Sequence, residues 1–178
     1  MTTTADQDAF LGALGRFASG VTVVTTILDG VDHAMTASAF TSVSLDPPLV
    51  LICSQKTSRF HEAVLQTGFW GVSILAEEGE LASAWFAHSG RPLENQLADF
   101  PYERGVSGAP LLGDSLAWLE CTTTAVHDGG DHAIIVGFVI AAGVRDDIDD
   151  PLLYYRSHYG TIIRSEASEK TILKADNS

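Results

Sequence analysis

Apolar and β-branched residues occur along this chain in short runs, which turn-forming residues separate. The clearest run, Val21–Leu28, is rich in valine and threonine, a composition typical of strands. Asp29-Gly30 follows it and is a hairpin signal, so we expect the chain to return as a second strand. Further runs predict strands at Leu49–Cys53, Phe69–Leu75, Leu116–Val126, Ala133–Ala142 and Leu152–Arg156.

Helical spacing occurs in three segments. Residues 8–19 predict a helix that Gly20 would end. Ser58 is expected to cap a helix over Arg59–Thr67, which Gly68 would close. Residues 77–87 predict another short helix. The side chains expected to face inward are Phe10, Ala13, Leu14 and Phe17 in the first helix, and Leu81, Ala84 and Trp85 in the last.

These elements predict a mostly β fold with short helices, in which six or seven strands form a closed or nearly closed barrel. Gly12 and Gly15 lie within the first predicted helix and not after a strand, so a Rossmann dinucleotide site is not supported. Residues 88–110 predict a long irregular segment, which is uncommon without a purpose. We expect one domain over residues 1–164 and a polar, loose tail over residues 165–178.

The segment Thr36–Ser44 holds five small hydroxyl residues in nine positions. It is expected to form one strand, which Pro47-Pro48 would end, because proline cannot donate to a sheet ladder. Small side chains let a flat ligand approach the backbone, and hydroxyl groups offer donors and acceptors to its polar edge. The alternative is a half-buried strand whose hydroxyl face contacts only water.

The charge balance is acidic: 23 Asp and Glu outnumber 10 Lys and Arg, for a formal net charge of −13. Nucleic acid and membranes are therefore not expected as partners, since phosphate surfaces need clustered basic residues. No apolar run approaches the ~20 residues of a membrane span, and Met1–Asp6 lacks the features of a signal peptide. Cys53 and Cys121 lie in apolar runs and are expected to be buried, reduced thiols of a cytoplasmic protein.

Two places could carry chemistry. At Ser58-Arg59, a helix N-terminus offers free N–H groups and the arginine a bidentate donor, which suits a phosphate; the alternative is a capped surface helix. In Gly129–His132 the glycines explain a tight turn, whereas His132 could act on a ligand or be an ordinary half-buried ring. A third interpretation is a metal site of zinc or iron type on His127, Asp128, Asp131 and His132.

Read together and in order, five motifs resemble the short-chain flavin reductases, above all those of actinobacterial aromatic degradation and antibiotic tailoring. These are the reductase components of two-component flavin-dependent monooxygenases. The motifs are Phe17–Thr26, Thr36–Ser44, Pro47–Leu51, Gly130–His132 and Pro151–Arg156. The chain departs from the family pattern at Ser73, where many relatives have asparagine, and after Ala87, where Arg91 could replace a lysine.

The resemblance implies an FMN-binding split β-barrel that forms a homodimer and reduces FAD or FMN with NADH for a separate monooxygenase. NADH is favoured over NADPH because no arginine pair is reserved for a 2′-phosphate. By position, the flavin ring and ribityl chain would contact Thr36, Ala37, Ser38, Ala39, Phe40, Val43 and Ser44, and its phosphate end Ser58, Arg59 and Phe60. His132 would be the catalytic residue beside the nicotinamide, with Tyr154, Tyr155 and Arg156 on the rest of the dinucleotide.

Two interpretations compete with this one. The first is a non-catalytic split-barrel module that holds flavin or haem, and it predicts a tightly held chromophore without NADH consumption. The second is a metal-dependent enzyme that uses the tip at His127–His132, and it predicts stoichiometric metal.

Overall fold

The computed structural model describes residues 6–145 and 150–163. Its helices are α1 (Gln7–Leu14), α2 (Arg59–Thr67) and α3 (Glu80–Ala87), with a 3₁₀ turn η1 (Glu77–Gly79) before α3. Its strands are β1 (Ser19–Gly20), β2 (Thr22–Leu28), β3 (Val31–Ala37), β4 (Phe40–Leu45), β5 (Pro48–Gln55), β6 (Phe69–Leu75), β7 (Tyr102–Arg104), β8 (Pro110–Leu112), β9 (Ser115–Gly129), β10 (His132–Val144), β11 (Leu153–Tyr155) and β12 (His158–Gly160).

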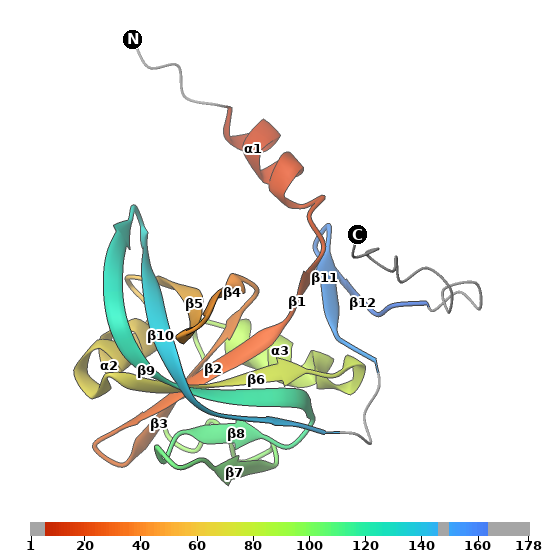
Figure 1. Ribbon diagram of the computed structural model, residues 1–178. Coiled ribbons are helices and arrows are strands. Elements are labelled where there is room, and N and C mark those ends of the chain that lie inside the picture. The colour runs from red at the N-terminus through yellow and green to blue at the C-terminus, as the bar shows by residue number, and fades with distance from the viewer. Residues whose placement is uncertain (1–5, 146–149, 164–178) are drawn as a thin grey trace, which may run out of the picture.

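Seven antiparallel strands form the main sheet, in the order β3-β2-β6-β9-β10-β5-β4 (Figure 1). Its two outer strands, β3 and β4, are separated in the chain only by Ser38 and Ala39. The chain therefore passes from one sheet edge to the other, and the Cys53 N–H donates to the Ala39 carbonyl at 3.0 Å. The sheet curls into a split barrel, as predicted. The hydroxyl segment is thus two strands and not the single strand expected, because the chain turns at Ser38-Ala39 to change edges.

Strand β2 is covered on both faces. Val24 packs in a cluster with Phe60 and Val64 of α2, and Val23 packs in a second cluster with Phe86 of α3. A strand buried on both faces has a continuous apolar run instead of an alternating one. This explains why the sequence shows the strand so clearly. The predicted Asp29-Gly30 turn follows it, with both residues at positive φ.

Trp70 of β6 fills the barrel interior and is fully buried. A Cβ on Gly137 of β10 would lie 2.5 Å from the Trp70 ring, so only glycine fits at this crossing. Cys121 lies in the same cluster. Both cysteines are free thiols; Cys121 is buried as expected, whereas Cys53 is only half-buried.

Helix α2 agrees with the sequence prediction at both ends. The Ser58 hydroxyl accepts a hydrogen bond from the His61 N–H at 3.1 Å, and Gly68 ends the helix in the left-handed region at φ 71°. Helix α3 has the predicted position but buries a different face, consisting of Ala82, Ser83 and Phe86. Because η1 precedes the α-helical turns, Leu81 points outward and is 79% exposed, Ala84 is exposed, and Trp85 is half-buried.

Helix α1 is shorter than predicted, and its apolar face is not covered by this chain. It ends at Leu14, since Gly15 caps it and the chain then turns into β1, where Gly20 lies. The helix projects away from the barrel (Figure 1), and none of its residues is buried. The apolar side chains expected to face inward are exposed instead: Phe10, Ala13, Leu14 and Phe17.

The β9–β10 hairpin is longer than predicted. The two strands pair up to Gly129 and His132, so the tip is only Gly130-Asp131, and Gly130 has φ 83°. At the carboxyl end, the predicted strand Leu152–Arg156 is β11, and a second strand, β12, returns beside it. Residues 165–178, predicted to be a loose tail, lie outside the described residues. Within residues 6–145 and 150–163, no helix is long and apolar enough to cross a membrane.

The segment 88–110 is largely irregular, as expected, but it contains β7 and leads into β8. Leu97 from this segment is buried in the second core cluster. The carboxylate of Glu120, itself fully buried, accepts from the N–H groups of Val106 and Ser107 at 2.9 and 2.8 Å. The long segment is therefore an ordered wall of the barrel and not a free loop.

Candidate functional site

Two hollows adjoin along β3 and the end of α3. The first, which we name the arginine hollow, has a volume of about 230 Å³ and is lined by Ala34, Met35, Gln55, Thr57, Ser58, Arg59, Phe60, Phe86, Ala87, Ser89 and Arg91. The second, which we name the tyrosine hollow, has a volume of about 200 Å³ and is lined by Val21, Thr36, Ser38, Ser83, Ala87, Tyr154 and Tyr159. Ala87 borders both, and successive residues of β3 line them in turn. They can therefore accept two parts of one extended ligand.

The arginine hollow brings together the predicted phosphate residues Ser58, Arg59 and Phe60. Ser58 is the N-cap of α2, so the first turn of that helix presents N–H groups and a partial positive charge here. Arg59 is exposed at the rim, and its Nη2 donates to the Arg91 carbonyl at 2.9 Å. Phe60 is almost fully buried and borders the hollow from the core.

Arg91 places a second guanidinium in this hollow. Its Nη1 donates to the carbonyls of Phe86 and His88 at 2.9 and 2.8 Å, and its Nη2 donates to the Ala34 carbonyl. Burial, followed by the charge of Arg59, lowers the pKa of Arg91 to about 10. Neither guanidinium forms an ion pair with a carboxylate within residues 6–145 and 150–163. Two unneutralised cations in one hollow favour an anionic ligand.

The tyrosine hollow holds Thr36, Ser38 and Tyr154 from the predicted flavin and dinucleotide residues. The Thr36 hydroxyl donates to the Ser83 carbonyl at 2.6 Å, so β3 is tied to α3 at this point. Tyr154 and Tyr159 have ring centroids 5.2 Å apart, and the Tyr159 hydroxyl shares a 2.8 Å hydrogen bond with the Ser83 hydroxyl. The hollow offers both aromatic surface and hydroxyl groups.

Seven other predicted binding residues do not line either hollow. Ala37 is buried and Phe40 is half-buried, and both belong to the core cluster around Trp70. The rest are Ala39, Val43, Ser44, Tyr155 and Arg156. Val43 is the extra residue of a bulge in β4 and is 49% exposed, and Arg156 donates its N–H to the Gly15 carbonyl at 2.9 Å.

His132 lies at the start of β10 and pairs in register with Gln55, which lines the arginine hollow. The His132 Nδ1 and a carboxylate oxygen of Asp131 are 2.8 Å apart, and this hydrogen bond fixes the ring. Lys56 holds the hairpin tip through Asp128 and the Gly130 carbonyl, at 2.5 and 2.6 Å. These bonds bring the tip against the segment that leads into α2.

In the metal set proposed for the tip, Asp128 accepts a hydrogen bond from Lys56, and Asp131 is paired with His132. The hydrogen bond from Lys56 lowers the pKa of Asp128, and the hydrogen bond from His132 lowers the pKa of Asp131. In the described part of the chain, no group of three or more His, Cys, Asp or Glu side chains could hold a metal ion.

Several lining residues carried no sequence signal. Ser89 comes from the irregular segment, and Tyr159 lies on β12, a strand that was not predicted. Arg91 comes from the same irregular segment and was noted only as a replacement for a lysine common in the flavin reductases that the chain resembles. Met35 lies on the predicted return strand beside buried Ala34, whereas Gln55 lies beyond the predicted strand Leu49–Cys53, and neither residue belongs to a motif. The departure noted at Ser73 lies away from the hollows, since Ser73 is buried and its hydroxyl accepts from the Leu112 N–H at 2.9 Å.

Known flavin reductases are similar to this chain over most of its length. A family model described as "Flavin reductase like domain" matches residues 14–162. A flavin reductase (NADH) from Kitasatospora aureofaciens is 41% identical over 157 residues, covering 86% of this chain and 81% of that protein. The reductase subunit HsaB of a flavin-dependent monooxygenase from Rhodococcus jostii is 39% identical over 155 residues, covering 86% of this chain and 77% of that protein.

A solved structure agrees with these relatives. The crystal structure of BorF, the flavin reductase component of a bacterial two-component tryptophan halogenase, is 40% identical to this chain with a TM-score of 0.83. The match covers 90% of this chain and 100% of that one. The similarity to known flavin reductases therefore extends over most of the chain.

Proposed function

The chain belongs to the flavin reductase family, and from that premise we propose that it oxidises NADH, reduces FAD or FMN and supplies the reduced flavin to a separate monooxygenase. It is an oxidoreductase, as its relatives are. The observation that carries the proposal is the pair of adjoining hollows, one with two unneutralised guanidiniums and one with hydroxyl groups and tyrosine rings. This donor set fits a molecule with an anionic end and a flat, polar-edged ring system.

In this proposal the arginine hollow binds the phosphate end of the flavin. Arg59 and Arg91 neutralise its charge, and the N–H groups of the first turn of α2 add hydrogen bonds beside the Ser58 cap. Thr36 and Ser38 lie farther along the same wall and contact the ribityl chain and ring. Ser38 is exposed and small, so the ring can approach the turn between β3 and β4.

When bound, the nicotinamide and flavin supply the hydride transfer, from C4 of one ring to N5 of the other. The protein contributes alignment and exclusion of water. His132, fixed by Asp131, orients the nicotinamide, and Tyr154 contacts the rest of the dinucleotide. Tyr155 and Arg156, which lie outside both hollows, contact it at their rim.

We further propose that the protein is a cytoplasmic homodimer. Phe10, Leu11, Leu14 and Phe17 are each at least 53% exposed on α1 and the turn after it, although all are large and apolar. Exposed apolar surface of this kind marks an interaction site, and a second copy of the chain is the occupant proposed here. Sedimentation analysis should give twice the monomer mass, and a monomer would exclude this part of the proposal.

The function is tested with the purified full chain. NADH oxidation is followed by the loss of NADH absorbance without flavin, with FMN and with FAD, and absorbance of the protein alone reports any chromophore that it retains. We expect strong stimulation by at least one flavin. A protein that retains flavin or haem but does not consume NADH, or one that needs a metal, would contradict the proposal.

A further inference from the structure

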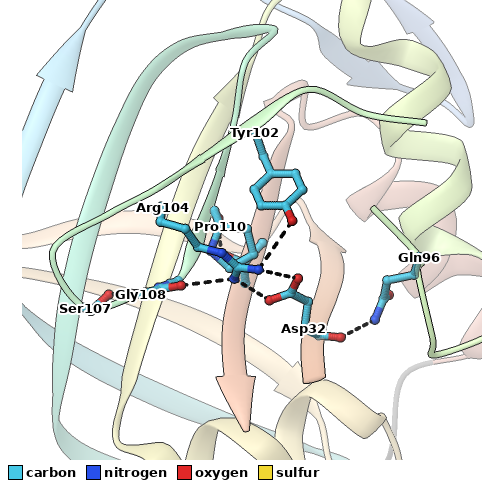
Figure 2. Close-up of polar contacts among 9 residues, drawn as sticks. Asp32, Gln96, Tyr102, Arg104, Ser107, Gly108 and Pro110 are labelled. Atoms are coloured by element: carbon cyan, nitrogen blue, oxygen red, sulfur yellow. Dashed lines mark hydrogen bonds and ion pairs between the residues drawn. The ribbon is translucent and has the colours of Figure 1, made fainter. Parts of the chain in front are cut away.

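Gln96 carries a buried amide that links the irregular segment after α3 to strand β3. It lies in the irregular segment after α3, and only 3% of the residue is exposed. Its Nε2 donates to the Asp32 carbonyl at 2.5 Å, as Figure 2 shows, and its Oε1 accepts from the Arg91 Nε at 3.0 Å. A carbonyl oxygen only accepts and a guanidinium only donates, so the amide has one possible orientation.

Asp32 is a fixed point for this amide. Its carboxylate accepts from Nη1 and Nη2 of Arg104 at 2.5 and 2.9 Å (Figure 2). Its backbone pairs with Ile27 in the β2–β3 ladder. Because Gln96 bonds to both Asp32 and Arg91, it holds the Arg91 side chain in a fixed position relative to strand β3.

Arg91 carries five N–H groups, of which four have partners: the carbonyls of Phe86, His88 and Ala34, and the amide of Gln96. All four partners are neutral. One N–H of Nη2 has no acceptor among the described residues, and the side chain lines the arginine hollow. The guanidinium is thus held by neutral groups with its charge available to a ligand in the hollow.

We propose that Gln96 is a positioning residue, which fixes Arg91 against the arginine hollow and so sets a preference for flavins that carry phosphate over riboflavin. This inference rests on the proposed function and adds a specificity determinant to it. FMN and riboflavin share the ring and ribityl chain and differ in the phosphate. Their relative affinity therefore reports the anion site and not the barrel.

Glutamine is suited to this position because it accepts from Arg91 without adding charge. Methionine in its place would fill similar volume but neither accept from Arg91 nor donate to Asp32. Glutamate would still accept from Arg91, but its charge would partly neutralise the guanidinium. Its second carboxylate oxygen would also lie against the Asp32 carbonyl, to which it cannot donate a hydrogen bond. The two replacements separate the orientation of Arg91 from the charge at the hollow.

The test measures dissociation constants for FMN and riboflavin by quenching of flavin fluorescence, with wild type, Gln96→Met and Gln96→Glu. We expect Gln96→Met to weaken FMN binding about tenfold and riboflavin binding by less than about twofold. Gln96→Glu should weaken FMN binding at least as much. The matched controls are Gln66→Met and Gln66→Glu, at an exposed position of α2, and they should leave both constants unchanged.

Arg91→Lys is a second, less buried variant, in case Gln96→Met does not fold. Lysine keeps the charge but cannot reach the same four acceptors, so the FMN preference should fall again. An unchanged FMN-to-riboflavin ratio in a folded variant, or equal loss for both flavins, overturns the inference. Wild-type NADH oxidation separates this failure from failure of the proposed function: if no flavin stimulates it, the proposed function itself is wrong.

Discussion

Glu120 is a buried carboxylate that fastens the irregular segment 88–110 to strand β9, and removal of its charge tests that role. The residue has no exposed surface, and its carboxylate accepts three hydrogen bonds. The donors are the N–H groups of Val106 and Ser107 and the Ser107 hydroxyl, at 2.9, 2.8 and 2.5 Å. Gly105 is required beside them, because a Cβ there would lie 2.2 Å from the carboxylate carbon.

Glu120→Gln keeps the shape but leaves one side-chain oxygen for three donors. An amide NH₂ would then face a backbone N–H, and a buried donor without an acceptor costs about 1–3 kcal/mol. The remaining bonds lose their charge assistance, which makes them roughly half as strong. Part of this loss is offset because a buried charge no longer has to be desolvated. We expect the free energy of unfolding to fall by about 2–3 kcal/mol, and Tm by about 4–12 °C.

Thermal unfolding followed by circular dichroism measures this change. The matched control is Glu103→Gln on β7, which makes the same chemical change at an exposed position and should alter stability by less than about 0.5 kcal/mol. Gly105→Ala should also destabilise the protein, since it displaces the intact carboxylate. If Glu120→Gln and Glu103→Gln unfold at the same temperature, the buried carboxylate does not fasten the segment.

Two further substitutions test the site, and one labelling experiment on the unchanged protein tests the core. His132→Ala should raise KM for NADH or lower kcat with little change in flavin affinity, and loss of flavin binding would contradict its assigned place. Ser38→Leu, at an exposed position of the tyrosine hollow, should weaken flavin binding roughly tenfold without lowering Tm, so unchanged affinity would remove Ser38 from the site. Burial, followed by the charge of Glu120, raises the pKa of Cys121 to about 12. At pH 8 its thiol is therefore protonated, and iodoacetamide should label Cys53 but not Cys121 in the folded protein, as peptide mass mapping would show.

Local rules predicted the parts of the fold that local interactions determine. The Asp29-Gly30 turn needs positive φ at both positions, and the cap at Ser58 and the stop at Gly68 satisfy the ends of α2 within the helix itself. Each of these signals is completed by neighbours in the sequence. Their positions could therefore be read without knowledge of the remaining chain.

Which faces of α1 and α3 the rest of the chain covers could not be predicted in the same way. A helix of eight residues has only about two turns, so apolar side chains occur on more than one face. In α3, the 3₁₀ turn before Glu80 and the packing of Phe86 against the second cluster decide which face is inward. In α1 the prediction that the apolar side chains face inward is wrong, because no part of the described chain covers them.

The residues of the candidate site also fall into two groups: those that local sequence signals could predict and those that tertiary contacts position. Ser58 and Arg59 were predicted because a helix start can be read locally, whereas Arg91 and Gln96 act in a segment without periodicity. That segment is ordered by side chains bonding to distant groups: Arg91 to the Ala34 carbonyl, Gln96 to the Asp32 carbonyl, and Glu120 to the N–H of Val106. Such bonds depend on residues that meet only after the barrel has formed. The same bonds that hold this wall also place the second guanidinium in the hollow, so order in the wall and charge in the site have one structural cause.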